Sequence, residues 1–189
     1  ERFRDMELER NLTPAVFSYE GIQYQYMAAE VLDEDALAYL QQHLRILSGF
    51  YGILRPFDGI VPYRLEMQAK AAVEGCKDLY DYWGDLMYRE LTEDGTRVIL
   101  NLASKEYSKC IERYLKPDDR FITVIFGEYH NGKVVQKGTM AKMARGEMVR
   151  YMAENQPENV DDIKNFGGLD YCFDQSLSNE TEYVFLKKL

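Results

Sequence analysis

A glycine-framed turn between two apolar segments is the feature that most constrains how this chain can fold. An apolar stripe at three- and four-residue spacing precedes the turn and predicts a packed helix that begins after Asp33: Leu37, Leu40, Leu44 and Leu47. Gly49 is placed to end this helix, because glycine adopts the left-handed cap conformation without strain. The chain then continues through Gly52 and Arg55-Pro56, so we expect a sharp corner here.

Helical and strand-like patterns are interspersed along the rest of the chain. A second helix is expected over residues 78–91, with Leu79, Tyr82, Trp83, Leu86 and Leu91 toward the core, and a third over residues 140–154. Short β-branched runs predict buried strands at 98–102 and 121–126, residues 183–186 are expected to close the sheet, and Asn131-Gly132 predicts a hairpin turn. The predicted fold class is α/β, a mixed sheet with surrounding helices in a single domain over residues 1–189.

Composition limits the class of protein. The 189 residues carry 46% hydrophobic and 29% charged side chains, as in a globular protein, and no apolar run approaches the roughly 20 residues needed to cross a bilayer. Three widely spaced cysteines form no C-x-x-C pair, which indicates reduced thiols and a cytoplasmic location: Cys76, Cys110 and Cys172. The chain begins with Glu1 in a charged stretch, so we expect a fragment that lacks an N-terminal segment.

Charge is unevenly distributed along a chain whose net charge is −9. The segment from residue 133 to residue 150 contains one acidic residue, Glu147, and five basic residues: Lys133, Lys137, Lys142, Arg145 and Arg150. Lys142 and Arg145 are three residues apart on one helix face, and Gly146 would allow a backbone or ligand to approach closely. The pattern is compatible with a basic binding surface, and equally with a solvated helix face.

Motifs for metal or nucleophile chemistry are missing from the sequence. The two histidines, His43 and His130, are far apart and have no cysteine or carboxylate at zinc-ligand spacing, so we predict no metal and no cofactor. Walker A, G-x-G-x-x-G and G-x-S-x-G motifs do not occur.

Two glycine- and arginine-rich segments are candidates for binding an anion. The turn from Ser48 through Gly49 to Gly52 could be the hairpin of a helix-hairpin-helix element, which binds phosphate through backbone N–H groups. It could equally be a plain helix C-cap followed by a tight corner. Arg55 and Arg64 lie on proline-bearing turns that suit capture of a phosphate or carboxylate, although a self-satisfied ion-pair cluster with Asp58 and Glu66 would look the same.

A second set of residues would suit proton-transfer chemistry if the fold brought them together. Its candidate catalytic residues are Glu66, Asp85, Asn101 and Glu106, with Arg64 and Ser104 as further members. Each also has an ordinary explanation as a cap or turn residue.

Taken together, these segments resemble the YaaA family of bacterial peroxide stress proteins. The resemblance rests on Pro62-Tyr63-Arg64-Leu65-Glu66-Met67, on Trp83-Gly84-Asp85 and on residues 41–45, 47–49, 51–52, 54–56, 77–80, 101–104, 106–107, 131–133 and 144–146. It implies a cytosolic bacterial α/β protein that limits damage where hydrogen peroxide meets intracellular iron. It also implies binding to duplex or branched DNA through a helix-hairpin-helix-like element at Ser48, Gly49 and Gly52 and a positive cleft at Arg55, Arg64, Lys142 and Arg145.

One departure from the family pattern concerns the start of the chain. Family members usually begin with a Ser-Pro-Ala-Lys-Thr-like motif on a first strand, which this sequence lacks, so we expect part of the binding surface to be missing. The leading hypothesis is a DNA-binding stress protein, and the alternative is an enzyme acting on a nucleobase, nucleotide or similar small anion. Direct iron sequestration finds little support, since the sequence has no Glu-x-x-His pair of the ferritin type.

Overall fold

The structure is a computed structural model that describes residues 10–188. Its residues form two compact units, each treated separately: unit 1 comprises residues 10–18, 41–97 and 103–119, and unit 2 comprises residues 19–40, 98–102 and 120–188. The predicted class, α/β with a mixed sheet, is confirmed. The expectation of a single domain over residues 1–189 stays a prediction, and residues 1–9 and 189 lie outside the described part.

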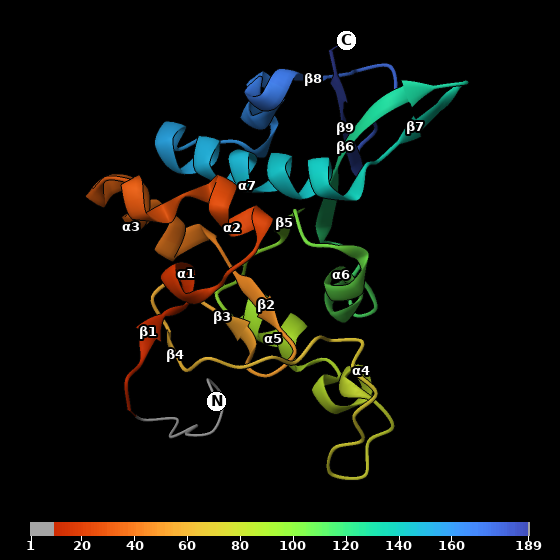
Figure 1. Cartoon of the computed structure of the whole chain (residues 1–189). Coiled ribbons are helices and arrows are strands. Elements are labelled where there is room, and N and C mark those ends of the chain that lie inside the picture. Colours follow the sequence, from red (N-terminus) through yellow and green to blue (C-terminus); the bar gives the residue numbers. More distant parts are fainter. Residues whose placement is uncertain (1–9, 189) are drawn as a thin grey trace. The chain divides into compact units, whose positions relative to one another are not determined.

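Unit 1 is built from short elements joined by long loops (Figure 1). Two antiparallel strand pairs, β1 with β4 and β2 with β3, lie among its helices. The elements are β1 (Thr13–Pro14), α1 (Ala15–Ser18), β2 (Ile46–Ser48), β3 (Gly52–Leu54), β4 (Gly59–Ile60), α4 (Leu79–Trp83), α5 (Leu86–Thr92) and α6 (Lys105–Glu112).

Unit 2 contains the main sheet, with strand order β5-β6-β9-β8 and with β7 paired to the far end of β6 (Figure 1). Strands β5, β6 and β9 are mutually parallel, whereas β7 and β8 run antiparallel to their partners. The elements are α2 (Ile22–Met27), η1 (Ala29–Val31), β5 (Val98–Asn101), β6 (Arg120–His130), β7 (Lys133–Val135), α7 (Gly138–Asn155), η2 (Val160–Asn165), η3 (Gly168–Asp170), β8 (Tyr171–Phe173) and β9 (Glu182–Lys187). The long helix α3 (Glu34–His43) begins in this unit and ends in unit 1.

Several predicted elements are confirmed with their physical causes. Asp33 accepts a hydrogen bond from the Ala36 N–H at 2.8 Å and so caps α3 as expected. Asn131 and Gly132 have φ values of 48° and 80°, which are the positive angles that a primed hairpin turn requires. The helix expected over 140–154 is α7, and the predicted strands at 98, 121 and 183 are β5, β6 and β9.

The first predicted helix is too long, and the helix-hairpin-helix interpretation of the turn is wrong. Helix α3 ends at His43, where the Arg45 guanidinium donates to the carbonyls of Gln42 and Leu44, both at 2.9 Å. The next residues form the antiparallel β2–β3 hairpin, so the turn from Ser48 to Gly52 joins two strands rather than two helices.

Two further expectations need correction. The helix predicted over 78–91 is divided into α4 and α5, because Gly84 between them has a φ of 48°, and Leu86 is exposed rather than in the core. The strand predicted as buried at 98–102 is β5, which lies at an end of the sheet, where Val98 is 49% exposed.

The core of unit 2 forms between the sheet and α7. Alternate β6 residues Ile122, Val124 and Phe126 are buried against Ala144 and Met148 of the helix. The opposite side of α7 packs against α2, where the backbones approach so closely that a Cβ on Gly146 would lie 2.0 Å from the Gln23 carbonyl oxygen. Gly146 therefore sets the spacing of these two helices.

Replacing Gly146 with alanine is expected to lower the free energy of unfolding by at least about 2 kcal/mol, because the added methyl group forces α2 and α7 apart. Gly138→Ala is the matched control on the same helix, since a Cβ added there would have no other atom within 4 Å. Its effect should stay within about 1 kcal/mol. Urea denaturation of both variants checks this, and equal stabilities would contradict the packing argument.

A charged network joins η2 to the first residues of β6 and β9 in unit 2. Tyr183 donates a hydrogen bond to the Asp161 carboxylate and accepts one from Arg120 at 2.8 Å. The Lys164 ammonium lies 2.8 Å from the same carboxylate, and Arg120 lies at 3.5 Å. Hydrogen bonds from Lys164 and then Tyr183 hold the pKa of Asp161 at about 2, below its ordinary value of 3.8.

Asp161→Asn is expected to make stability less sensitive to acid. Because the folded pKa lies below the unfolded one, the carboxylate stabilises the fold fully above the unfolded pKa of about 3.8 and loses that contribution as the pH falls toward 2. Urea midpoints at pH 6 and pH 3 should therefore fall less in Asp161→Asn than in the wild type. Glu158→Gln changes an exposed carboxylate outside the network and should keep the wild-type dependence, and the same fall in all three proteins would contradict the assignment.

Candidate functional site

The turn from Ser48 to Gly52 in unit 1 is held by hydrogen bonds to a buried serine side chain. Ser48 is 1% exposed, and its hydroxyl oxygen accepts hydrogen bonds from the N–H groups of Phe50 at 3.1 Å and Tyr51 at 2.9 Å. A third contact, at 2.5 Å, joins it to the hydroxyl of Tyr63. The Ser48 hydroxyl thus takes part in three hydrogen bonds, and in the contact with Tyr63 either hydroxyl can be the donor.

Two glycines let the surrounding chain close on this turn. A Cβ on Gly49 would lie 2.8 Å from the Leu65 carbonyl oxygen, and one on Gly52, whose φ is 77°, would lie 2.7 Å from the Trp83 ring. The Trp83 indole N–H donates to the Gly49 carbonyl at 3.0 Å, and the Tyr51 hydroxyl accepts from the Val61 N–H at 3.0 Å. Ser48, Gly49 and Gly52 are thus engaged in internal packing.

A group of hydroxyls and carboxylates forms beside the turn, and we call it the hydroxyl–carboxylate cluster: Ser48, Tyr63, Glu66, Glu106 and Tyr107. Burial raises the pKa of Tyr107 to about 12, with smaller rises from the charge of Glu106, from Tyr63 and from Glu66. Tyr107 therefore keeps its proton at neutral pH and can donate a hydrogen bond. Glu66 and Glu106, two of the four predicted catalytic candidates, both lie near enough to Tyr107 for their charges to raise its pKa.

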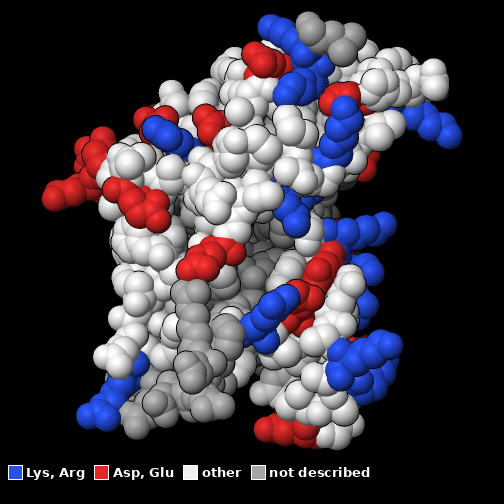
Figure 2. All heavy atoms as spheres, in the orientation of Figure 1, with Lys and Arg blue, Asp and Glu red and all other residues white. Residues whose placement is uncertain are grey.

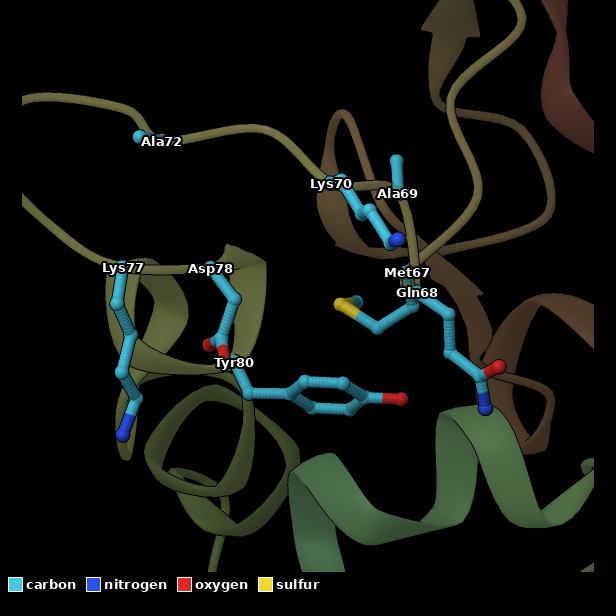
Figure 3. Close-up of a pocket in the computed structure, with 8 residues that line it drawn as sticks. All are labelled: Met67, Gln68, Ala69, Lys70, Ala72, Lys77, Asp78 and Tyr80. Atoms are coloured by element: carbon cyan, nitrogen blue, oxygen red, sulfur yellow. The ribbon is translucent and has the colours of Figure 1, made fainter.

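Glu106 also organises the loop that precedes α4. Its Oε1 accepts a hydrogen bond from the Gln68 N–H at 3.1 Å, and its backbone carbonyl accepts one from the Tyr80 hydroxyl at 2.9 Å. Gln68 and Tyr80 line a cavity of about 440 Å³ between this loop and the start of α4 (Figure 3). The cluster therefore borders a space of the size that small ligands occupy.

The other two predicted catalytic candidates lie elsewhere. Asp85 is exposed at the start of α5 and forms an ion pair with Arg89 at 3.4 Å. Asn101 belongs to unit 2, where it is 7% exposed and its side-chain amide donates to the Thr123 hydroxyl at 3.2 Å. Asp85 is thus engaged with its own helix, and Asn101 with the main sheet.

The predicted basic residues are divided between the units. Arg55 and Arg64 of unit 1 are exposed, and neither forms an ion pair within the described part of the chain. Burial and then the nearby charge of Arg55 lower the pKa of Arg45, a residue that sequence reasoning does not select. The predicted ion-pair partner Asp58 instead accepts from the Arg55 N–H at 2.7 Å and so orders the turn.

Lys142 and Arg145 lie on α7 in unit 2. Lys142 is exposed, whereas the Nε atom of Arg145 is buried and has no hydrogen-bond partner in residues 10–188. Burial lowers the pKa of the Arg145 guanidinium, and no carboxylate of residues 10–188 forms an ion pair with it. By contrast, Arg150 on the same helix is paired with Glu154 at 2.8 Å. A buried arginine donor without a partner is a group that an anion could satisfy.

Charge on the visible face of the molecule is mixed. Figure 2 shows lysine and arginine side chains with carboxylates among them on this face.

Potential metal ligands and thiols are dispersed through the fold. No group of three or more His, Cys, Asp or Glu side chains that could hold a metal ion occurs within residues 10–188. The three cysteines are unpaired thiols, and burial raises the pKa of Cys110 to about 11, which keeps it in its unreactive protonated form. No helix in the described part is long and apolar enough to span a bilayer.

Sequence reasoning assigns no functional role to four of the residues described above: Tyr107, Tyr80, Gln68 and Arg45. Arg45, Tyr80 and Tyr107 lie in segments that carry the family resemblance, but tyrosine and glutamine have no spacing pattern that points to a site. Only the fold shows that the Tyr80 hydroxyl and the Gln68 N–H donate hydrogen bonds to Glu106.

Comparison with known proteins gives a consistent result over nearly the whole chain. A sequence model described as "Peroxide stress protein YaaA" matches residues 1–177. A UPF0246 protein of Lachnoclostridium phytofermentans is 60% identical over 187 residues, which cover 99% of this chain and 73% of that relative. UPF0246 proteins of Agathobacter rectalis and Desulfitobacterium hafniense are 56% and 52% identical, and the alignments cover 100% of this chain and 75% of each relative. The chain therefore belongs to the family of the peroxide stress protein YaaA.

Proposed function

We propose that this member of the peroxide stress family binds DNA and so limits iron-dependent oxidative damage to it. The observation that carries the proposal is Arg145, whose buried Nε has no hydrogen-bond partner and whose guanidinium has no ion-pair partner among residues 10–188. Lys142 lies one turn earlier on α7, in the most basic segment of the chain. A DNA phosphate would supply the missing acceptor to Arg145 and a second charge contact to Lys142.

Unit 1 would contribute separate phosphate contacts in this proposal. Arg55 and Arg64 are exposed, have no ion pair in the described part of the chain, and lie on loops whose backbones are held by hydrogen bonds. The contacts come from arginine side chains, since the β2–β3 turn uses its Ser48 hydroxyl and two N–H groups internally. In this proposal, protection against iron acts through the bound DNA.

The contrast between Arg145 and Arg150 provides the test. In fluorescence anisotropy with labelled duplex and branched DNA across a salt series, Arg145→Ala should weaken binding about tenfold and reduce the salt slope by about 0.9 for a lost phosphate contact. Arg150→Ala removes the same charge from the same helix, but Glu154 already neutralises this arginine. It should therefore change the affinity little.

Arg64→Ala tests the contribution of unit 1 in the same titrations and should also weaken binding. Equal losses in Arg145→Ala and Arg150→Ala would show that only net charge matters. Unchanged affinity and salt slope in Arg145→Ala, Lys142→Ala and Arg64→Ala would show that DNA binds another surface, and absence of binding at low salt would overturn the proposal.

The hydroxyl–carboxylate cluster favours a second candidate function, namely an enzyme acting on a nucleobase, nucleotide or similar small anion. Glu106 and Glu66 could accept a proton, and Tyr107, protonated at neutral pH, could donate a hydrogen bond to the substrate. The adjoining cavity would hold the substrate next to these groups. Glu106 would be the general base, because a hydrogen bond from the Gln68 N–H fixes the position of its carboxylate.

Turnover of a panel of nucleosides and mononucleotides, followed by chromatography, tests this second function. Glu106→Gln should reduce any turnover by about 100-fold or more, since a general base contributes on that order. Glu112→Gln lies on the same helix and is exposed, so it should retain wild-type activity. Turnover that is equal in all three proteins would exclude Glu106 as the base, and no turnover of any compound would exclude the function for this substrate class.

A further inference from the structure

The cavity of unit 1 combines an aromatic ring with a cation, and this combination restricts what it can bind. Its lining includes Met67, Gln68, Lys70, Asp78 and Tyr80, and its volume is about 440 Å³ (Figure 3). That volume lies within the range of sites for small ligands. Met67 in this lining is fully buried, whereas Gln68 and Lys70 are exposed.

Tyr80 is fixed in place as an aromatic platform. Its hydroxyl donates to the Glu106 carbonyl at 2.9 Å, and burial raises its pKa against the smaller, opposing effect of a hydrogen bond from the Gln68 side chain. The Arg113 guanidinium lies over the ring, 5.0 Å from its centroid. Figure 3 shows the ring extending across the cavity toward Gln68. One face of the ring is occupied by Arg113, so a flat ligand group would stack on the other face.

The lining contains two lysines, and Lys70 is the one whose side chain extends toward Met67 and Gln68 (Figure 3). Lys77 belongs to the lining just before α4. Within residues 10–188, Lys70 forms no ion pair or hydrogen bond. The Asp78 carboxylate, also in the lining, is engaged as the N-cap of α4, where it accepts from the Asp81 N–H at 2.8 Å. The available charge is therefore positive.

We propose that this cavity binds a planar aromatic ring that carries an anionic group, with a mononucleotide as the ligand that fits best. The ring stacks on Tyr80, the anionic group contacts the Lys70 ammonium, and the Gln68 carboxamide contacts the ring edge. This inference rests on the second candidate function and names its ligand class, and it is independent of DNA binding by Arg145. Glu106 would then lie beside the bound ring through its contacts with both Gln68 and Tyr80.

Isothermal titration calorimetry of the protein with adenosine monophosphate, adenosine and inorganic phosphate tests the inference. The mononucleotide should bind more tightly than either part alone. Lys70→Gln should weaken binding of the mononucleotide about tenfold, the value of a charge-assisted contact, and leave adenosine unchanged. Lys105→Gln is the matched control, because this exposed lysine of unit 1 is not among the residues that line the cavity, and it should bind like the wild type.

The aromatic contact is tested by two changes at Tyr80. Tyr80→Leu should weaken both adenosine and the mononucleotide about fivefold or more through loss of stacking, whereas Tyr80→Phe keeps the ring and should retain most of the affinity. Thermal unfolding of each variant identifies loss of folding. Titration with 4-hydroxybenzoate tests whether the anionic group of the ligand is a carboxylate rather than a phosphate. If 4-hydroxybenzoate binds more tightly than adenosine monophosphate, the ligand is an aromatic carboxylate and not a nucleotide.

The outcomes separate this inference from the catalytic proposal. Binding that depends on Lys70 and Tyr80 without turnover would support the site and exclude the enzyme. Turnover that depends on Glu106, with binding insensitive to Lys70→Gln and Tyr80→Leu, would overturn the site and support the enzyme. Equal effects of Lys70→Gln and Lys105→Gln, or no binding heat at millimolar ligand, would also overturn the inference.

Discussion

The hydrogen bonds of the Ser48 hydroxyl are the constraint on which the candidate site of unit 1 depends. By accepting from two N–H groups of its own turn and contacting Tyr63, this buried hydroxyl ends β2 and orients the loop that follows β4. Close approach at Gly49 and Gly52 then brings the segment around Leu65 and the Trp83 ring against the turn. The cluster and the cavity both lie on segments positioned in this way, so the turn acts as scaffold rather than as the binding surface.

Local signals in the sequence predicted much of the fold. The Asp33 cap, the Asn131-Gly132 turn and the α7 periodicity depend on neighbours within four residues, and all three are present in the structure. The end of α3 and the break at Gly84 could not be predicted in this way. They depend on pairing of β2 with β3 and on the Trp83 contact with Gly49, which join residues far apart in the sequence.

The same distinction applies to the candidate sites. The sequence points to Arg145, Glu66 and Glu106, but what makes them candidates is visible only in the fold. Arg145 and Arg150 look alike as basic residues of one helix, yet of these two only Arg150 has a carboxylate partner among residues 10–188. Likewise, Tyr80 and Lys70 gain a role because the loop before α4 places them around a common space (Figure 3). Whether a side chain has an ion-pair partner, and whether solvent can reach it, depends on the tertiary structure and cannot be predicted from residue spacing.

The central claim is that DNA contacts the unpaired cations of α7, and amide chemical-shift mapping by nuclear magnetic resonance tests it most directly. A ¹⁵N-labelled sample titrated with a short duplex should show its largest α7 shifts from Lys142 to Gly146, with the Arg145 Nε–H resonance moving as it gains an acceptor. The amides around Lys70 and Tyr80 should remain unchanged by the duplex. Shifts centred on Lys70 and Tyr80, with an unmoved Arg145 Nε–H, would contradict the account.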